Sequence, residues 1–587
     1  MVRPFGVQEV YIEVASDIEI GAPRTMTPLR NPATVLLAIF LATCSPSSIE
    51  TDTLDRGSVT EEHVMIPMRD GVRLSAYLYF TEGKGPWPVL YEQRYADLRA
   101  DRTRRILAEL ASHGYVVCAQ NFRGAHLSEG VWDGYRSLGW GDLQDGYDTV
   151  EWLADQPWSN GKIGTFGASQ GGFAQNFLAV TQPPHLVAQY MVDTGLSLFH
   201  EGYRIGGATK PNRFKAMDRN CRVPEHNDRW LRETFEHPTY DEYWRQEDST
   251  LHFDKMNVPA FTIGSWYDYM SVGSIDSFVG RQHRGGPNSR GVQKLLLGPW
   301  LHGRYNKNSK VGELQYPENS TFDVNAHMIE WFNHHLKGAD NRVDREPAVR
   351  YYVMGAVGEP GAPGNEWRTA DDWPIPVKET SYYFTPSNEL GQGGLVLEAP
   401  VSSEGRTEYR SDPNNPAPIR TRAFPGARDA RLYEQHPEPQ TFTTEPLAAP
   451  VEWTGKVKVE LYISANVKDA DYIVRLSDVY PDGRSVLIMD KVQRARFREG
   501  FDREVLMEPD KVYKLAFDIH SLSQIFNKGH RVRVTVGSTG DEFYEPNPHT
   551  GGPMTIEPPE EMLIADNVIH HTKQYASRII APLVEEP

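Results

Sequence analysis

The chain has 587 residues, 39% hydrophobic and 24% charged, which is typical of a globular protein with two or three domains. Its 79 acidic residues exceed its 61 Lys and Arg, and the formal net charge is −18. No basic block is present to neutralise phosphates, so we expect no nucleic-acid partner. Three cysteines are too few for a disulfide framework.

Segment 26–44 resembles an export signal. A charged start precedes an eleven-residue, mostly apolar run over 33–43, too short to span a bilayer. The sequence Leu41-Ala-Thr-Cys44 resembles a lipoprotein box with Cys44 as lipid anchor, although Thr43 departs from the usual pattern. We predict that residues 1–58 are a leader, this signal and a linker on an exported bacterial protein, either periplasmic, membrane-anchored or secreted. The alternative is a disordered tail with a chance apolar stretch.

An α/β domain is predicted over residues 59–194 and 256–344. It opens with a hairpin whose turn is Arg69-Asp70-Gly71. Strands then alternate with helices: strands near 88–91, 114–118, 162–166, 258–263 and 293–297, and helices near 102–113, 143–156 and 324–336. This alternation predicts a mostly parallel, doubly wound sheet.

Two further segments differ in pattern. Residues 195–255 are rich in Arg, His, Asn, Glu and aromatics and show no clear strand, so we predict a helical cap. Residues 345–587 carry many short alternating strands with Pro and Gly turns, for example Lys456–Ile463 and Arg531–Val536. They predict an all-β domain, a β-sandwich of jelly-roll type.

The most informative motif is Gly167-Ala-Ser-Gln-Gly171, which follows a short apolar strand and precedes a helix. In this strand-turn-helix context G-x-S-x-G is a nucleophile elbow, which presents the Ser169 hydroxyl at the top of a sheet. The alternative is a glycine-rich turn with an incidental serine.

A serine nucleophile needs a base and an orienting carboxylate, and in this fold they follow in the order acid, then histidine. Asp268 comes after the strand near 258–263, and His302 comes after the strand near 293–297. The carboxyl ends of these strands share one sheet edge with Ser169. Each residue alone could be a chance match, but their order and places together favour a Ser-His-Asp triad.

These motifs resemble the cocaine-esterase-like hydrolases and the related X-Pro dipeptidyl peptidases, glutaryl acylases and α-amino acid ester hydrolases. The resemblance rests on Gly167–Gly171, Gly264-Ser-Trp-Tyr-Asp268 and Gly298-Pro-Trp-Leu-His302, and it spans about residues 60–580. It implies an α/β-hydrolase domain followed by a jelly-roll domain. It also implies that the Tyr95 hydroxyl and the backbone N–H of Gln170 stabilise the oxyanion.

Four aromatic residues near the motifs could line an acyl pocket or merely pack the loops: Phe173, Trp266, Tyr267 and Trp300. The neighbouring histidines His334-His335 and His570-His571 are not expected to bind a metal, because adjacent residues on a helix do not face one another. We expect no metal and no cofactor.

The sequence therefore predicts a serine hydrolase acting on a small-molecule ester or amide. Relatives that bind a substrate ammonium carry acidic residues just after the catalytic aspartate, whereas no acid directly follows Asp268 here. The resemblance therefore implies an uncharged or acidic acyl group. The runner-up is an X-Pro dipeptidyl-peptidase or α-amino acid ester hydrolase, with Glu201 or Asp193 supplying the charge for a substrate ammonium. A surface glycan-binding protein is the alternative from another class. The substrate, the oligomeric state and any Cys118–Cys221 bond stay open.

Overall fold

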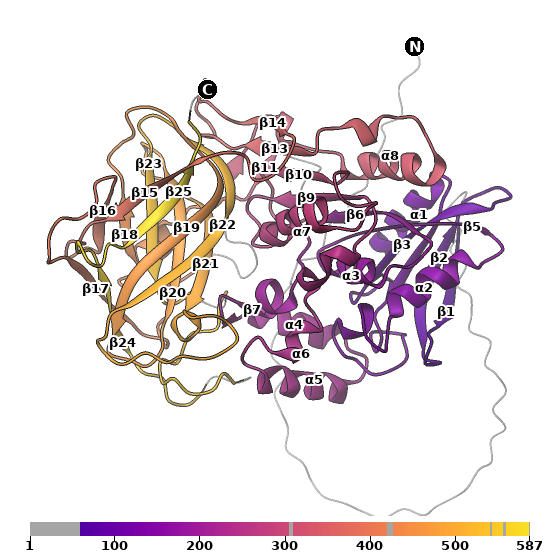
Figure 1. The fold of residues 1–587 in the computed structure, drawn as a ribbon, viewed down its shortest axis with the longest axis horizontal. Coiled ribbons are helices and arrows are strands. Elements are labelled where there is room, and N and C mark those ends of the chain that lie inside the picture. The colour runs from indigo at the N-terminus through magenta and orange to yellow at the C-terminus, as the bar shows by residue number, and fades with distance from the viewer. Residues whose placement is uncertain (1–58, 304–308, 420–425, 541–542, 556–558, 586–587) are drawn as a thin grey trace, which may run out of the picture.

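The computed structural model describes residues 59–303, 309–419, 426–540, 543–555 and 559–585 (Figure 1). The predicted export segment and Cys44 lie outside these residues. Within them, no helix is both long and apolar enough to cross a membrane.

A ten-stranded sheet forms the frame of the first part, in the order β1-β2-β4-β3-β5-β6-β9-β10-β13-β14. The strands are β1 (Thr60–Pro67), β2 (Arg73–Phe80), β3 (Trp87–Arg94), β4 (Val116–Asn121), β5 (Ser159–Ala168), β6 (Leu186–Val192), β9 (Ala260–Ser265), β10 (Lys294–Gly298), β13 (Val349–Val353) and β14 (Glu366–Ala370). All pairs from β4 to β13 are parallel, and the predicted hairpin is β1–β2. The prediction of a mostly parallel sheet is confirmed.

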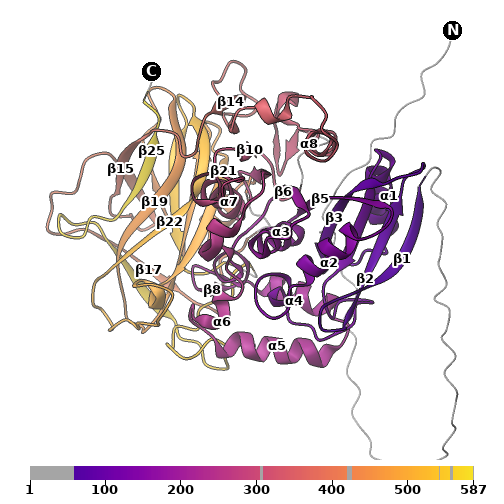
Figure 2. The ribbon, with the colours of Figure 1, turned by 45° about the vertical axis from the view of Figure 1, so that its right-hand side comes forward.

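Helices cover both faces of this sheet (Figures 1 and 2). They are α1 (Asp101–Ser112), α2 (Asp145–Ala154), α3 (Gln170–Thr181), α7 (Ser271–Arg284) and α8 (Val324–Lys337), with short turns η1 (Arg136–Leu138), η4 (Glu318–Ser320) and η5 (Val343–Arg345). Helices α1 and α8 share one apolar core with the sheet, while α2 and α3 share another. Helix α1 buries Ile106, Leu107 and Leu110, as its spacing predicts.

The predicted cap consists mainly of short helices. Its elements are η2 (Leu198–Tyr203, a π-helical turn), β7 (Arg204–Ile205), β8 (Ala208–Thr209), α4 (Pro211–Asn220), α5 (Pro224–Glu236), α6 (Glu242–Arg245) and η3 (Ser249–Lys255). Its aromatic side chains form one buried cluster with Tyr95 and Phe173, so the cap packs directly on the segments around Ser169.

The C-terminal part is a β-domain, as predicted. Its strands are β15 (Lys378–Phe384), β16 (Gln392–Val396), β17 (Arg406–Ser411), β18 (Gln440–Thr443), β19 (Val451–Ala465), β20 (Asp471–Val479), β21 (Ser485–Arg494), β22 (Tyr513–Phe526), β23 (Arg531–Gly537), β24 (Ala565–His570) and β25 (Arg578–Leu583). Strand β16 pairs with both β15 and β18 and thereby joins two groups of strands. Strand β19 buries its alternating face: Val457, Val459, Leu461 and Ile463.

The α/β sheet continues past residue 344, where the sequence placed the start of the β-domain. Strand β13 extends the sheet because it pairs in parallel with β10, and β14 closes that edge. Beyond β13, the amide of Met354 donates to the carbonyl of Ser523 on β22 at 2.9 Å. The two parts thus share a hydrogen-bonded interface.

The remaining elements are short. They are the hairpin of β11 (Lys310–Val311) and β12 (Leu314–Gln315), and the helices α9 (Arg431–Glu434) and η6 (Ala495–Phe497).

Cys118 lies buried in β4, and Cys221 follows the last turn of α4. Both are free thiols in the described part of the chain. The structure therefore contains no Cys118–Cys221 bond.

Candidate active site

Ser169 is the single residue between the end of β5 and the start of α3. Its φ of 54° and ψ of −109° are rare outside glycine and cost of order 1–3 kcal/mol. Its amide donates to the carbonyl of Val192 at 2.9 Å, and its carbonyl accepts from the amides of Gly172 and Phe173 at 3.0 Å. The Ser169 side chain does not cap α3. The strained turn is therefore held by its backbone, as a nucleophile elbow requires.

The two outer glycines of the motif are required by packing. A Cβ atom on Gly167 would lie 3.2 Å from the Cα of Gly171 and equally close to Oε1 of Glu92. A Cβ on Gly171 would meet the same Glu92 oxygen at 3.2 Å. Gly167 also has a φ of 144°. The strand and the helix can approach this closely only because both positions lack a side chain.

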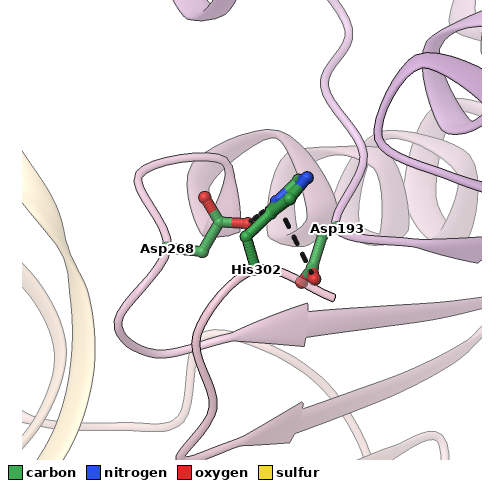
Figure 3. Close-up of side chains that lie close together, drawn as sticks. All are labelled: Asp193, Asp268 and His302. Atoms are coloured by element: carbon green, nitrogen blue, oxygen red, sulfur yellow. Dashed lines mark hydrogen bonds and ion pairs between the residues drawn. The ribbon is translucent and has the colours of Figure 1, made fainter. Parts of the chain in front are cut away.

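Asp268 and His302 lie in the loops after β9 and β10, and the structure brings their side chains together (Figure 3). The Oδ2 of Asp268 lies 2.6 Å from the Nδ1 of His302. The Oδ1 of Asp268 accepts from the amide of Met270 at 2.9 Å, which fixes the carboxylate. Since Nδ1 faces the carboxylate, Nε2 is the ring nitrogen left to act as a base.

Asp193 is a second carboxylate at this histidine, at the end of β6 (Figure 3). Its Oδ2 accepts from the amide of Gly303 at 2.8 Å and lies 3.9 Å from Nδ1 of His302. Asp193 is fully buried and has a φ of 45°. Burial, and then the charge of Asp268, raise the pKa of Asp193 to about 7.

The electrostatics at His302 combine opposing influences. Burial is the largest and lowers its pKa, but the charge and hydrogen bond of Asp268 and the charge of Asp193 outweigh it. The positive charge of Arg213 acts in the same direction as burial. The net result is a pKa above the ordinary value of 6.5.

These three side chains could also converge on a cation, since one ligand atom from each lies within 4.8 Å of the others. However, the Nδ1 of His302, the ring nitrogen nearest both carboxylates, is already engaged by Asp268 at 2.6 Å. The arrangement matches the acid and base of a triad, and we assign no metal to it.

Gln170 connects the nucleophile turn to the segment that carries Tyr95. Its side-chain oxygen accepts hydrogen bonds from the backbone amides of Tyr95 and Ala96, both at 2.9 Å. Gln170 is 6% exposed and Tyr95 is 7% exposed. The tyrosine predicted to donate to the oxyanion is thus tied through its backbone to the residue after Ser169.

The four aromatic residues suggested for the pocket separate into two kinds. Phe173 lies in the cluster that includes Tyr95 and the cap. The other three have polar atoms bonded elsewhere: the indole N–H of Trp266 donates to the carbonyl of Tyr352 at 2.8 Å, that of Trp300 to the carbonyl of Ser320 at 2.7 Å, and the hydroxyl of Tyr267 lies 2.6 Å from that of Tyr316. These bonds favour a packing role for Trp266, Tyr267 and Trp300.

A cavity of about 60 Å³ adjoins the turn on the side of α1 and α8. It is lined by Glu92, Arg94, Arg102, Thr103, Ile106, Leu107, Phe166, Gly167, Ala168, Gln170, Tyr190, Val192, Val324 and Met328. Within it, Arg94 lies 3.5 Å from the carboxylate of Glu92, so this cation has an acidic neighbour.

Two polar residues near the site were not among the predicted site residues. Asp193 was considered only as a possible partner for a substrate ammonium, although its place directly after β6 gives the same signal as Asp268 after β9. Arg213, on α4, had no sequence signal, because only the folded cap brings it to Tyr95 and Phe173.

With this geometry established, comparison with known proteins is informative. The X-Pro dipeptidyl-peptidase (S15 family) matches residues 70–229 and 215–304, and the X-Pro dipeptidyl-peptidase C-terminal non-catalytic domain matches residues 341–580. The chain belongs to this hydrolase family. The resemblance inferred from the motifs is therefore confirmed.

Curated relatives cover most of the chain. Cocaine esterase of Rhodococcus sp. is 29% identical and aligns with 89% of this chain and 98% of its own length. A putative serine esterase of Mycobacterium bovis is 25% identical over 89% of this chain and 95% of its own.

Solved structures support the fold. An aminopeptidase from a marine-sediment Thaumarchaeota archaeon matches with a TM-score of 0.77 at 24% identity, covering 92% of this chain and 99% of its own. An α-amino acid ester hydrolase matches with a TM-score of 0.76 at 22% identity, covering 92% and 100%. Both share the architecture of an α/β domain with a C-terminal β-domain.

Proposed function

We propose that the chain is an esterase or acylase that forms an acyl-enzyme on Ser169, with His302 as general base and Asp268 as its orienting carboxylate. The observation that carries this proposal is the 2.6 Å contact between Asp268 Oδ2 and His302 Nδ1, at the same sheet edge as the strained Ser169 turn. A buried histidine held by a carboxylate at this place has the geometry of the base in a triad.

In the proposed reaction, the Ser169 hydroxyl attacks the carbonyl carbon while Nε2 of His302 takes its proton. The tetrahedral intermediate collapses, the C–O or C–N bond breaks, and the leaving group takes that proton from His302. Water then attacks the acyl-enzyme, giving one proton to His302, which returns it to Ser169 as the acid is released. Asp268 stabilises the imidazolium in both halves.

The oxyanion in this mechanism is stabilised by the Tyr95 hydroxyl and the backbone amide of Gln170. Support comes from the two hydrogen bonds that tie the Tyr95 segment to the Gln170 side chain. A neutral phenol close to the reacting carbonyl donates most strongly when negative charge develops.

The proposed acyl group is uncharged or acidic. Tyr269, Met270 and Ser271 follow Asp268, so no carboxylate comes directly after the catalytic acid. Glu201, a candidate for binding an ammonium, instead accepts from the backbone amide of Leu196 at 2.6 Å. This use of Glu201 weighs against a dipeptidyl-peptidase or amino-ester substrate.

A fluorophosphonate probe tests the nucleophile. We expect the probe to add one label to the wild-type protein, at Ser169 on peptide mapping, and none to Ser169→Ala. Ser112→Ala, an exposed serine at the end of α1, is the matched control and should label like the wild type. Failure to label would refute the hydrolase proposal and favour the glycan-binding alternative.

Export belongs to the proposal as well. Segment 26–44 has the pattern of a signal peptide ending at Cys44, a candidate lipid anchor. Intact mass of the protein from its native membrane or medium tests this, because export predicts the loss of residues 1–43. A retained N-terminal segment in membrane-free protein would contradict it.

A further inference from the structure

Four polar residues follow four adjacent strands of the α/β sheet, β5, β6, β9 and β10. Ser169 and Asp193 come directly after β5 and β6, while Asp268 and His302 lie in the loops after β9 and β10. The proposed mechanism gives a role to three of these residues. It gives none to Asp193, although this carboxylate is fully buried beside the histidine.

The end of β6 is bonded to both the nucleophile turn and the histidine loop. The carbonyl of Val192, the last residue of β6, accepts from the amide of Ser169 at 2.9 Å. The Oδ2 of Asp193, the next residue, accepts from the amide of Gly303 at 2.8 Å. Because Gly303 directly follows His302, Asp193 is placed to control where the imidazole lies.

The contact with Gly303 does not by itself account for a carboxylate at this position. An asparagine oxygen could accept from the same amide without bringing a charge into the interior. The other oxygen of Asp193, Oδ1, is buried and has no hydrogen-bond partner among the described residues, and the φ of 45° is uncommon outside glycine. Strained backbone and unpaired buried polar atoms both lower stability, and both concentrate at functional sites.

Both carboxylates face the same ring nitrogen of His302 (Figure 3). Nδ1 lies 2.6 Å from Oδ2 of Asp268 and 3.9 Å from Oδ2 of Asp193. A displacement of about 1 Å would bring Nδ1 within hydrogen-bond distance of Asp193. A small movement of the ring is therefore enough to transfer the hydrogen bond of Nδ1 from one carboxylate to the other.

We propose that Asp193 is a second positioning residue for His302. It holds the histidine loop through Gly303, shares the stabilisation of the imidazolium with Asp268, and accepts the hydrogen bond of Nδ1 when Asp268 is neutralised. This inference rests on the proposed function at Ser169, because it adds a role within that mechanism. Neutralising Asp268 also removes a charge that, after burial, raises the pKa of Asp193, so that Asp193 is then more fully ionised.

A double-mutant cycle on one ester tests this role. Asp193→Asn removes the charge but keeps an oxygen for the Gly303 amide, and asparagine tolerates left-handed backbone angles. On the high-pH plateau, where His302 is neutral, we expect Asp193→Asn to lower kcat about threefold in the wild type and about 30-fold in Asp268→Asn. KM and the melting temperature should change little. Asp155→Asn, at an exposed aspartate after α2, is the matched control and should leave kcat unchanged in both backgrounds.

Asp193→Ala separates the charge from the contact with the loop. Alanine removes both, so this variant should lose more activity than Asp193→Asn, and equal losses would contradict the part assigned to the Gly303 contact. If Asp193→Asn has the same effect in both backgrounds, Asp193 acts independently of Asp268 and the proposal is refuted. An unchanged kcat in both backgrounds would refute it as well, because Asp193 would then be no more than a support for the loop.

A crystal structure of the Asp268→Asn protein tests the proposal without any measurement of turnover. We expect Nδ1 of His302 to lie about 2.7–2.9 Å from Oδ2 of Asp193, instead of 3.9 Å. A ring that stays at its wild-type distance from Asp193 would overturn the proposal. If the fluorophosphonate fails to label Ser169, the proposed function fails, yet this distance still decides whether Asp193 can replace Asp268 as the partner of Nδ1.

Discussion

Replacing Gln170 by methionine tests how the proposed oxyanion site is held together. The Gln170 side-chain oxygen accepts from the amides of Tyr95 and Ala96 at 2.9 Å each, and methionine of similar length offers no such acceptor. A buried N–H left unpaired costs about 1–3 kcal/mol, so the two amides together provide about 2–6 kcal/mol to drive the segment into another position. This range brackets the roughly 3–4 kcal/mol that one oxyanion donor contributes.

We therefore expect Gln170→Met to lower kcat about 10²-fold, toward the value for Tyr95→Phe, with little change in KM. The backbone amide of Gln170 survives the substitution, so activity should not vanish. The decisive assay is a double-mutant cycle on one ester, with melting temperatures measured on the same preparations. Because both changes act on one hydroxyl, Gln170→Met should cost no more than about threefold in the Tyr95→Phe background.

Fully additive losses in this cycle would refute the reasoning, because Gln170 would then act on something other than Tyr95. An unchanged kcat with a lower melting temperature would show that Gln170 only packs the segment.

The remaining predictions concern the triad and export. Ser169→Ala should lower kcat by about 10⁶-fold and Asp268→Asn by about 10⁴-fold, each with a nearly unchanged melting temperature. If either variant keeps activity within tenfold of wild type, the triad role proposed for that residue is excluded. His302 must be neutral to act as a base, so kcat/KM should rise with pH through a midpoint above 6.5. Asp193→Asn removes a charge that raises the pKa of His302, so the midpoint should move to lower pH; an unmoved or higher midpoint would contradict this. Cys44→Ser should release an exported, lipidated protein from membranes, as fractionation would show.

Much of the fold was predictable because local patterns agree with the tertiary structure. The alternation of strands and helices predicted the parallel sheet, and the order of parallel strands brings their carboxyl ends to one edge. Asp268 and His302 could be chosen from the sequence for this reason, and the structure places them 2.6 Å apart.

Elements that depend on long-range packing were missed. Helix α7 carries three serines and two glycines, which lower its intrinsic helix propensity, yet it buries Ile275 and Phe278. Strand β13 looked like the start of the β-domain, because no local feature shows that it pairs with β10.

The same limit applies to individual side chains. The hydrogen bond from the Tyr95 amide to the Gln170 side chain joins residues 75 positions apart. The donor is a backbone amide, which has no sequence signature. Asp193 lies beside His302 with a backbone φ of 45°, which no local pattern predicts, and Arg213 reaches Tyr95 through the fold of the cap.

The charges around the proposed nucleophile are arranged asymmetrically, and this arrangement bears on the protonation of His302. Asp268 and Asp193 lie on the Nδ1 side of His302 and favour its protonated form, whereas Arg213 opposes protonation. Arg213→Gln removes the opposing charge and should therefore raise the pKa of His302. Because His302 must be neutral to act as a base, the midpoint of the rise of kcat/KM with pH should move to higher pH, the opposite of the shift expected for Asp193→Asn. A midpoint that stays in place or moves to lower pH would contradict this assignment of charges.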